Sequence, residues 1–173
     1  MGMSSREWSR YMREVLGVPR EPEEISTAVV ERLAERYRER VPLLPHALET
    51  VRSLAERRPL GIASSANRPL IELVLELTGM RRLFRATVSS EEVPRGKPAP
   101  DVYLEAARRL ATAPEICAAI EDSTNGILAA LRAGMRVVAV PRPDYPPSQD
   151  AMERAHAVVG SLEEVPAALD AVS

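Results

Sequence analysis

Two acidic residues stand side by side directly after a short apolar segment. Glu121 and Asp122 follow the apolar residues 116–120 and precede the polar run Ser123-Thr124-Asn125-Gly126. Adjacent carboxylates at the end of a strand are costly to bury without a cation, and Mg²⁺ prefers carboxylate oxygens while keeping several waters. The pair therefore indicates a magnesium site. The alternative is that Asp122 or Ser123 caps the next helix, which leaves Glu121 unexplained.

A second polar run, Ser64-Ser65-Ala66-Asn67, follows the apolar residues 60–63 and leads into a helical pattern. Hydroxyl groups and free backbone N–H groups at the start of a helix are suited to binding phosphate. Serine and asparagine are also common N-cap residues, so capping alone is the other explanation. In open α/β sheets ligands bind at the carboxyl ends of the strands, where both polar runs are expected.

Lys97 is the one lysine among 23 lysine and arginine residues, and it lies in a loop rich in proline and glycine at 93–100. Lysine carries a compact charge on a flexible stem, whereas arginine is a planar fork. A tight pocket in which one cation neutralises a phosphate and also contacts a carboxylate favours lysine. We therefore expect Lys97→Arg to be disruptive, and the reverse exchange on outer helix faces, at Arg36 or Arg109, to cost little.

The elements that hold these residues follow from the spacing of apolar and turn-forming residues. Two helices are expected within residues 1–41, the first opened by a capping box from Ser4 to Glu7 and the second by Pro22. From residue 42 onward, short apolar strands alternate with amphipathic helices. This alternation predicts an α/β fold with a Rossmann-like parallel sheet, covered by helices on both faces. The expected strands are 60–63, 85–88, 116–120, 137–140 and 157–159.

The composition is that of an ordinary globular protein: 173 residues, 45 % apolar, 28 % charged and a formal charge of −2. Mixed charges give no case for a nucleic-acid partner, and no apolar run is long enough for a membrane span. The single cysteine, Cys117, excludes an internal disulfide, and His46 and His156 lie too far apart to suggest a zinc site. The expected compartment is cytoplasmic. Aromatic residues are only 3 %, so the core should be aliphatic.

Three segments together resemble motifs two, three and four of the haloacid dehalogenase superfamily, in matching order and spacing. They are Ala63-Ser64-Ser65-Ala66-Asn67-Arg68, Gly96-Lys97-Pro98-Ala99-Pro100-Asp101-Val102-Tyr103 and Glu121-Asp122-Ser123-Thr124-Asn125-Gly126-Ile127. Within the superfamily, the chain resembles the β-phosphoglucomutase-like and phosphoglycolate-phosphatase-like branch with a helical cap. The resemblance implies a partial helical cap at residues 1–41 and an α/β core at residues 42–173.

The resemblance also implies a role for each motif. Ser64 would donate its hydroxyl to the transferring phosphoryl group, with the Ser65 N–H beside it. Lys97 would neutralise the phosphoryl oxygens and steady the nucleophile. Glu121 and Asp122 would hold Mg²⁺ directly or through water.

Two further residues are expected near the substrate. Gly2-Met3-Ser4-Ser5-Arg6-Glu7 resembles the cap loop of that branch, which contacts substrate. By this resemblance Arg6 would contact the distal part of the substrate, and Asn67 would line the same opening. His46, next to Pro45, is expected to be a surface loop residue and not a base.

The first motif of the superfamily, an Asp-x-Asp at the end of the first core strand, is absent, because no aspartate precedes Asp101. The resemblance implies that its first aspartate attacks phosphorus and its second acts as general acid and base. The sheet is accordingly expected to lack its middle strand, leaving the neighbouring edges unpaired. Three explanations stay open: an N-terminally shortened phosphatase, a remnant that binds phosphate or Mg²⁺ without turnover, or a strand supplied by another chain or copy.

The function expected from the resemblance is that of a Mg²⁺-dependent phosphatase acting through an aspartyl-phosphate on a small phosphorylated metabolite, such as a sugar phosphate. The alternatives are a phosphoglucomutase-type transfer within one sugar and a non-catalytic phosphate- or Mg²⁺-binding remnant. A dehalogenase is disfavoured, since that branch lacks the pair seen at Glu121 and Asp122. The sequence names neither the substrate nor the oligomeric state.

Overall fold

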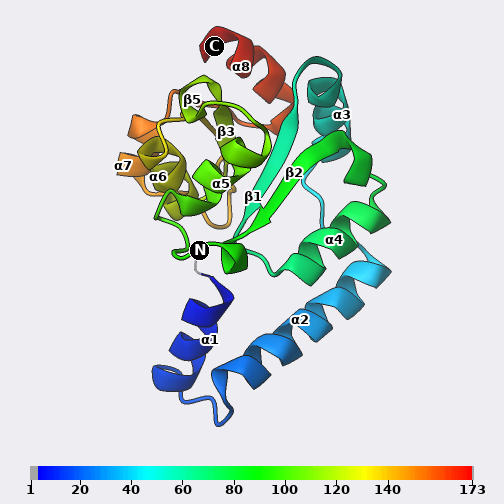
Figure 1. Ribbon diagram of the computed structural model, residues 1–173, viewed down its shortest axis with the longest axis vertical. Coiled ribbons are helices and arrows are strands. Elements are labelled where there is room, and N and C mark those ends of the chain that lie inside the picture. Colours follow the sequence, from blue (N-terminus) through cyan, green and yellow to red (C-terminus); the bar gives the residue numbers. More distant parts are fainter. Residues whose placement is uncertain (1–3, 173) are drawn as a thin grey trace.

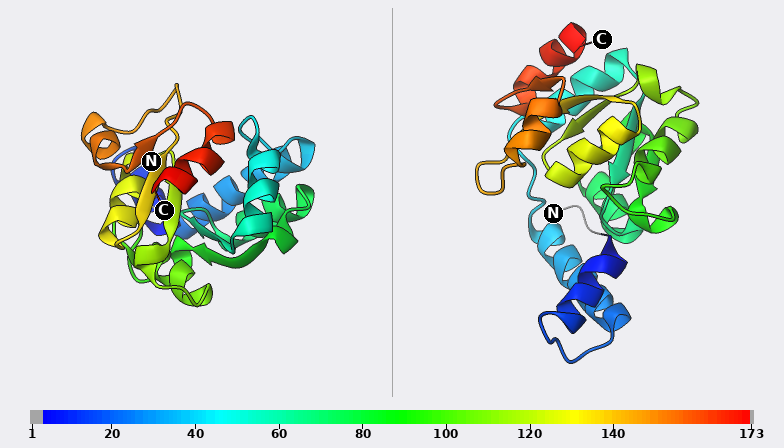
Figure 2. Two further views of the ribbon diagram at one scale, coloured as in Figure 1. Left: turned by 90° about the horizontal axis from the view of Figure 1, so that it is seen from above. Right: turned by 90° about the vertical axis from the view of Figure 1, so that its left-hand side faces the viewer.

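The computed structural model describes residues 4–172 and shows an α/β body from which a pair of helices extends (Figure 1). The pair consists of α1 (Ser5–Glu14) and α2 (Pro22–Glu39). Figure 2 shows that both helices lie beyond one end of the body, away from the strands. Of the expected cap loop, Gly2 and Met3 lie outside the described residues.

The starts of these two helices follow the expected local chemistry. The backbone N–H of Ser4 donates to the Glu7 carboxylate at 2.7 Å, which is the predicted capping box. Pro22 occupies the first turn of α2, where its missing N–H costs nothing. Helix α2 packs along α4, which connects the pair to the body.

The body alternates strands and helices, as the sequence predicts. Its strands are β1 (Leu60–Ser64), β2 (Phe84–Ser89), β3 (Ala118–Glu121), β4 (Arg136–Ala139) and β5 (Ala157–Val158). Its helices are α3 (Ala47–Arg57), α4 (Arg68–Leu77), α5 (Asp101–Arg109), α6 (Thr124–Arg132), α7 (Gln149–Arg154) and α8 (Val165–Val172).

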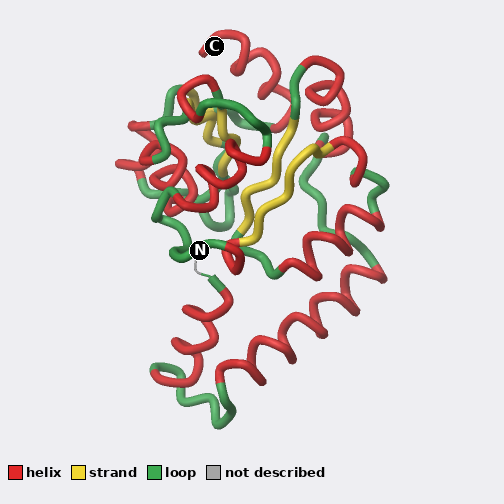
Figure 3. The backbone as a smooth tube through the Cα atoms, viewed as in Figure 1, coloured by secondary structure: helices red, strands yellow, loops and turns green. Residues whose placement is uncertain are grey.

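The strands form two parallel sheets instead of one. Strand β1 pairs with β2, and β3, β4 and β5 follow one another in a second sheet. Within residues 4–172 no pairing joins β1 to β3, and Figure 3 shows the two groups of strands side by side but separate. The predicted parallel α/β fold is confirmed, and the sheet is interrupted where the middle strand was expected to be missing.

The buried core is aliphatic, as the low aromatic content predicts, with Tyr103 as the aromatic exception. Alternate residues of β4 belong to two different hydrophobic clusters. Val137 and Ala139 pack in a cluster with α5 and α6, whereas Val138 joins a cluster with α3 and α8. Because side chains alternate along a strand, these clusters lie on opposite faces of the sheet.

One local prediction was wrong, and one helix was missed. Strand β3 begins at Ala118 and not at residue 116, because Pro114–Ile116 form a 3₁₀ turn. No helix was predicted between the proline-rich loop and β5, yet α7 forms there. It is capped by Ser148, whose hydroxyl accepts from the Ala151 N–H at 3.3 Å. None of the helices within residues 4–172 is both long and apolar enough to cross a bilayer.

Candidate active site

The carboxyl ends of β1 and β3 meet at a cavity of about 480 Å³. Five predicted site residues line it, although they come from three distant segments: Ser64, Ser65, Lys97, Glu121 and Asp122. Parallel strands bring their carboxyl ends to one edge of a sheet, which explains why residues so far apart in sequence meet. Since both strands end at this cavity, β1 and β3 run in the same direction.

Ser64 ends β1 and starts the turn into α4. Its hydroxyl oxygen accepts the Ala66 N–H at 3.1 Å. A hydroxyl that accepts a hydrogen bond still has its own proton to donate. The backbone carbonyl of Ser64 accepts from the Ser90 hydroxyl at 3.1 Å, which connects this turn to the end of β2.

Lys97 is buried, with only 7 % of its side chain exposed. Its Nζ lies 2.5 Å from Glu121 Oε1 and 3.2 Å from the Tyr103 hydroxyl, and it sits over the Tyr103 ring at 4.8 Å from the centroid. The loop around it is held by Arg132, which donates to the Pro98 carbonyl at 2.7 Å. The predicted tight pocket with a carboxylate beside the lysine is therefore present.

Glu121 is buried and fully hydrogen-bonded. Oε1 faces Lys97 and the Tyr103 hydroxyl, and Oε2 accepts from the Ser123 hydroxyl at 3.0 Å and from the Asp122 N–H at 3.2 Å. Burial alone would raise the pKa of Glu121, but the charge and hydrogen bond of Lys97, with those of Tyr103 and Ser123, hold that pKa below its ordinary value. Glu121 is therefore ionised at neutral pH.

Tyr103 was quoted within a motif but received no role from sequence reasoning. Burial, and then the negative charge of Glu121, raise the pKa of Tyr103 well above its ordinary value. The phenol accordingly keeps its proton and donates it to the Glu121 carboxylate. Lys97, Glu121 and Tyr103 form one charge-balanced unit, here called the Lys97 triad.

Glu121 and Asp122 have different surroundings, which sequence reasoning did not predict. The cation that balances buried Glu121 is Lys97, so the burial of that acid does not by itself require a metal. Ser123 is the N-cap of α6 and accepts the Gly126 N–H at 3.1 Å. Asp122 is therefore not the cap, and it is a half-buried carboxylate that lines the cavity.

The donor set can be tested against Mg²⁺. Residues 4–172 hold no group of three His, Cys, Asp or Glu side chains placed to bind a metal. Mg²⁺, however, is usually bound by one or two carboxylates together with waters and phosphate oxygens. Asp122, with Glu121 beside it, fits such a site. Lys97 is paired with Glu121, so Asp122 is the carboxylate that would bind the metal ion.

Asn67 and Arg6 lie at the junction of α1 with the body. The Asn67 side chain accepts from the Ser5 hydroxyl at 2.8 Å and donates to Glu91 at 2.7 Å. Arg6 lies in the first turn of α1 and is exposed. Neither residue is among those that line the cavity. Their roles in substrate binding stay predictions.

His46 precedes α3 in a left-handed turn and is exposed, with Nε2 3.5 Å from a Glu163 carboxylate oxygen. It does not line the cavity of about 480 Å³. This position agrees with the expected surface loop residue.

Gly126 is a site residue that sequence reasoning missed. A Cβ built at this position would overlap the Glu121 carboxylate. The signal was present, because a glycine in the first turn of a helix is unfavourable by about 1 kcal/mol relative to alanine and calls for a reason such as close approach.

A family model for haloacid dehalogenase-like hydrolases matches residues 2–134. The chain belongs to this family. Hexitol phosphatase B of Escherichia coli K12 is 38 % identical over 123 residues, covering 70 % of this chain and 55 % of that protein. The chain thus spans little more than half the length of this curated relative.

Solved structures share the fold over nearly the whole chain. CbbY from Rhodobacter sphaeroides, crystallised with phosphate, superposes with a TM-score of 0.85 at 25 % identity, covering 98 % of this chain and 79 % of that one. β-Phosphoglucomutase from Clostridium difficile superposes with a TM-score of 0.80 at 21 % identity, covering 98 % and 78 %. Both superpositions show the fold that the resemblance to the β-phosphoglucomutase-like branch implies.

Proposed function

We propose that this chain forms the phosphoryl-binding site of a Mg²⁺-dependent phosphatase that acts on a small phosphorylated metabolite such as a sugar phosphate. One observation carries the proposal: Ser64, Ser65, Lys97 and Asp122 line a single cavity at the carboxyl ends of β1 and β3. This set combines a hydroxyl donor, the start of a helix, a buried cation and a carboxylate. The hydroxyl, the helix start and the cation are suited to binding a phosphoryl group, and the carboxylate is suited to binding Mg²⁺.

Each side chain has a definable task toward a phosphoryl group. The Ser64 hydroxyl donates to one oxygen, while the turn into α4 presents backbone N–H groups. Lysine has three N–H donors, and Lys97 directs two of them at Glu121 and Tyr103. The third is left for a phosphoryl oxygen, so the Lys97 triad holds the ammonium in place while it neutralises charge.

Mg²⁺ would be held directly by Asp122 and only through water by Glu121, whose two oxygens are already hydrogen-bonded. When bound, Mg²⁺ would neutralise charge on the phosphoryl oxygens. Glu121 already faces Lys97, so the two carboxylates contribute differently. The charge of Glu121 is balanced by Lys97, so Asp122 supplies the negative charge that attracts Mg²⁺. Glu121 positions Lys97 and the backbone that carries Asp122.

A second candidate is binding of phosphate and Mg²⁺ without turnover. Glu121 and Asp122 are the only carboxylates among the described residues that line the cavity, and Glu121 is committed to Lys97. Because Asp122 is assigned to Mg²⁺, neither of these two carboxylates is left to serve as the nucleophile that the resemblance implies. The name of hexitol phosphatase B supports a polyol or sugar phosphate as the ligand of either candidate.

The test measures two quantities on the same protein. Release of inorganic phosphate is followed with a panel of hexitol and hexose phosphates, with Mg²⁺ and with EDTA, and calorimetry measures the affinity for inorganic phosphate. Mg²⁺-dependent release that is lost in Lys97→Arg, but kept in Arg36→Lys, supports the phosphatase. Phosphate binding without release supports the second candidate. Absence of both overturns the proposed site.

A further inference from the structure

The turn at residues 64–67, which leads from β1 into α4, is held by two buried serines at the end of β2. Ser89 is fully buried and Ser90 is 3 % exposed. The Ser90 hydroxyl donates to the Ser64 carbonyl at 3.1 Å, and the Ser89 hydroxyl donates to the Ala66 carbonyl at 2.7 Å. Neither serine is among the described residues that line the candidate active site. Any contribution they make to that site therefore passes through the backbone of the turn.

The register of the sheet explains why Ser90 reaches the Ser64 carbonyl. Strands β1 and β2 are parallel, with Ser64 opposite Ser89. The hydrogen bonds of a parallel pair are evenly spaced along the strands. Ser90 is the first residue after β2, so its hydroxyl continues the hydrogen bonding of the sheet by one step.

This contact fixes the direction of the neighbouring N–H group. A trans peptide unit is planar, so its C=O and its N–H point in opposite directions. Within residues 4–172 the one cis peptide bond is Lys97–Pro98, so the Ser64–Ser65 unit is trans. Because the Ser64 carbonyl points to Ser90 at the end of β2, the Ser65 N–H points away from β2.

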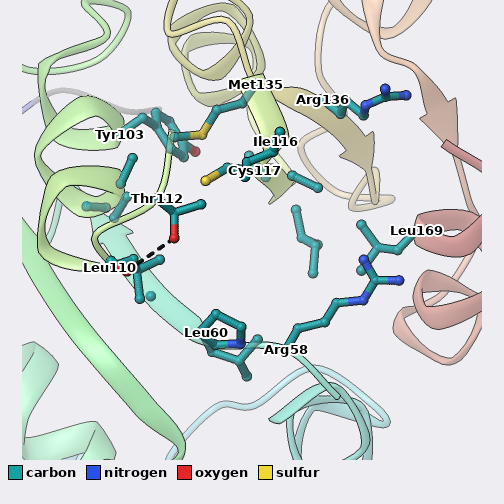
Figure 4. A pocket seen from close by; sticks show the side chains of 18 of the residues that line it. Arg58, Leu60, Tyr103, Leu110, Thr112, Ile116, Cys117, Met135, Arg136 and Leu169 are labelled. Carbon is teal, nitrogen blue, oxygen red and sulfur yellow. Dashed lines mark hydrogen bonds between the residues drawn. The ribbon is translucent and has the colours of Figure 1, made fainter. Parts of the chain in front are cut away.

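The side of β1 away from β2 is the side on which β3 lies. Figure 4 shows the cavity of about 710 Å³ between these two strands, where Leu60 at the start of β1 faces Cys117. Where both strands end, the candidate active site is lined by Ser65, Lys97 and Asp122. The Ser65 N–H is therefore directed to the side of the turn on which Lys97 and Asp122 lie.

We propose that Ser90 is a positioning residue of the phosphoryl-binding site, which directs the Ser65 N–H by holding the Ser64 carbonyl. The inference rests on the proposed function, because it assigns this N–H to a phosphoryl oxygen. A donor that is held in place before the ligand arrives needs no reorganisation when the ligand binds. Loss of the Ser90 hydroxyl would therefore weaken binding without removing any group that touches the ligand.

Ser90→Ala tests this role, because the Ser90 hydroxyl makes no other hydrogen bond within residues 4–172. Ser89 is less suitable, since its hydroxyl also caps the 3₁₀ turn that follows β2. The matched control is Ser9→Ala. Ser9 is also buried, at 2 % exposed, and its hydroxyl donates to the Arg6 carbonyl within α1.

The first measurement is the direction of the Ser65 N–H in the protein without phosphate, from ¹⁵N–¹H residual dipolar couplings. We expect the Ser65 coupling to change in Ser90→Ala and to equal the wild-type value in Ser9→Ala. A role of Ser90 in stability alone would not move this coupling. An unchanged Ser65 coupling in Ser90→Ala would overturn the inference.

The second measurement is the affinity for inorganic phosphate in the presence of Mg²⁺, by calorimetry. We expect Ser90→Ala to bind about tenfold more weakly, as for a misdirected hydrogen bond to a charged group, and Ser9→Ala to bind like wild type. Equal affinity of Ser90→Ala and wild type, or equal weakening in both variants, would overturn the inference and leave the proposed function standing. Absence of phosphate binding by the wild type would overturn the proposed function, and the role of Ser90 toward phosphate with it.

Discussion

At the residue scale, the site depends on one buried cation with three tasks. Lys97 balances Glu121, lies over Tyr103 and faces the cavity. We predict that Lys97→Arg lowers the affinity for inorganic phosphate by about 10–10²-fold, because the planar fork displaces the charge and a hydrogen bond to a charged group is worth about 1.5–3 kcal/mol. Calorimetric titration measures it. An unchanged affinity would show that the position of the Lys97 charge does not matter for phosphate binding.

The matched control for that exchange is Arg36→Lys, at an exposed position of α2. Arg109, which sequence reasoning placed on an outer helix face, is unsuitable. Its guanidinium donates to the Thr87 carbonyl at 2.7 Å and to Glu92 at 2.9 Å, so it joins α5 to the end of β2. Arg109→Lys should therefore lower stability.

The pKa of Glu121 makes a second residue-scale prediction. Because that pKa is lower in the folded protein than its ordinary value, the folded state binds fewer protons than the unfolded chain. The stabilisation is complete above the unfolded pKa of about 4.3 and is lost as the pH falls through the folded pKa. Urea unfolding between pH 7 and pH 3 should therefore show a smaller loss of stability in Glu121→Gln than in wild type. Identical slopes would contradict the Lys97 triad.

Gly126 leads to a third prediction at the residue scale. In Gly126→Ala the new methyl group overlaps the Glu121 carboxylate and displaces it from Lys97. We expect a loss of about 1–3 kcal/mol in the free energy of unfolding, with weaker phosphate binding by calorimetry. Gly160→Ala is the control, because its methyl group would meet only the Glu164 side chain at 3.3 Å. Full phosphate affinity in Gly126→Ala would show that the Glu121 position is unimportant.

At the element scale, the start of α6 serves both the helix and the site. The Ser123 hydroxyl caps α6 and donates to Glu121, whereas the Ser148 hydroxyl caps α7 alone. Ser123→Ala and Ser148→Ala should each cost about 1 kcal/mol of stability, as lost N-caps do. Only Ser123→Ala should also weaken phosphate binding. If both variants lose phosphate affinity equally, the contact between Ser123 and Glu121 contributes nothing to the site.

The helices and strands show which features of the fold can be predicted from the sequence. Apolar spacing located β1 and β4 closely, and the rule that parallel strands end at one edge brought Ser64 together with Asp122. Helix α7 was missed because it is short and its signal is a lone cap, Ser148, behind a proline-rich loop. Tyr103 was left without a role because its hydrogen-bond acceptor, Glu121, comes from another segment, and a contact of that kind has no local pattern.

At the scale of the whole molecule, the site bridges two separate sheets. Lys97 follows β2 in the chain and Glu121 ends β3, so their 2.5 Å ion pair joins the two halves. Removing one partner of a buried pair costs about 3–5 kcal/mol, a large share of the stability of a single domain. We therefore predict a loss of this size in Lys97→Met by urea unfolding. The exposed control Arg36→Met should change stability little, and a similar small change in Lys97→Met would contradict the bridge.

The central claim is that the cavity holding Lys97 binds a phosphoryl group with Mg²⁺. Its most direct test is an NMR titration of the ¹⁵N-labelled protein with inorganic phosphate in the presence of Mg²⁺. The predicted result is saturable shifts in the amides of Ser65, Ala66, Lys97 and Asp122, which line the cavity, and loss of those shifts in Lys97→Arg. Saturation with shifts confined to other parts of the chain, or no shifts at these four amides, would contradict the account.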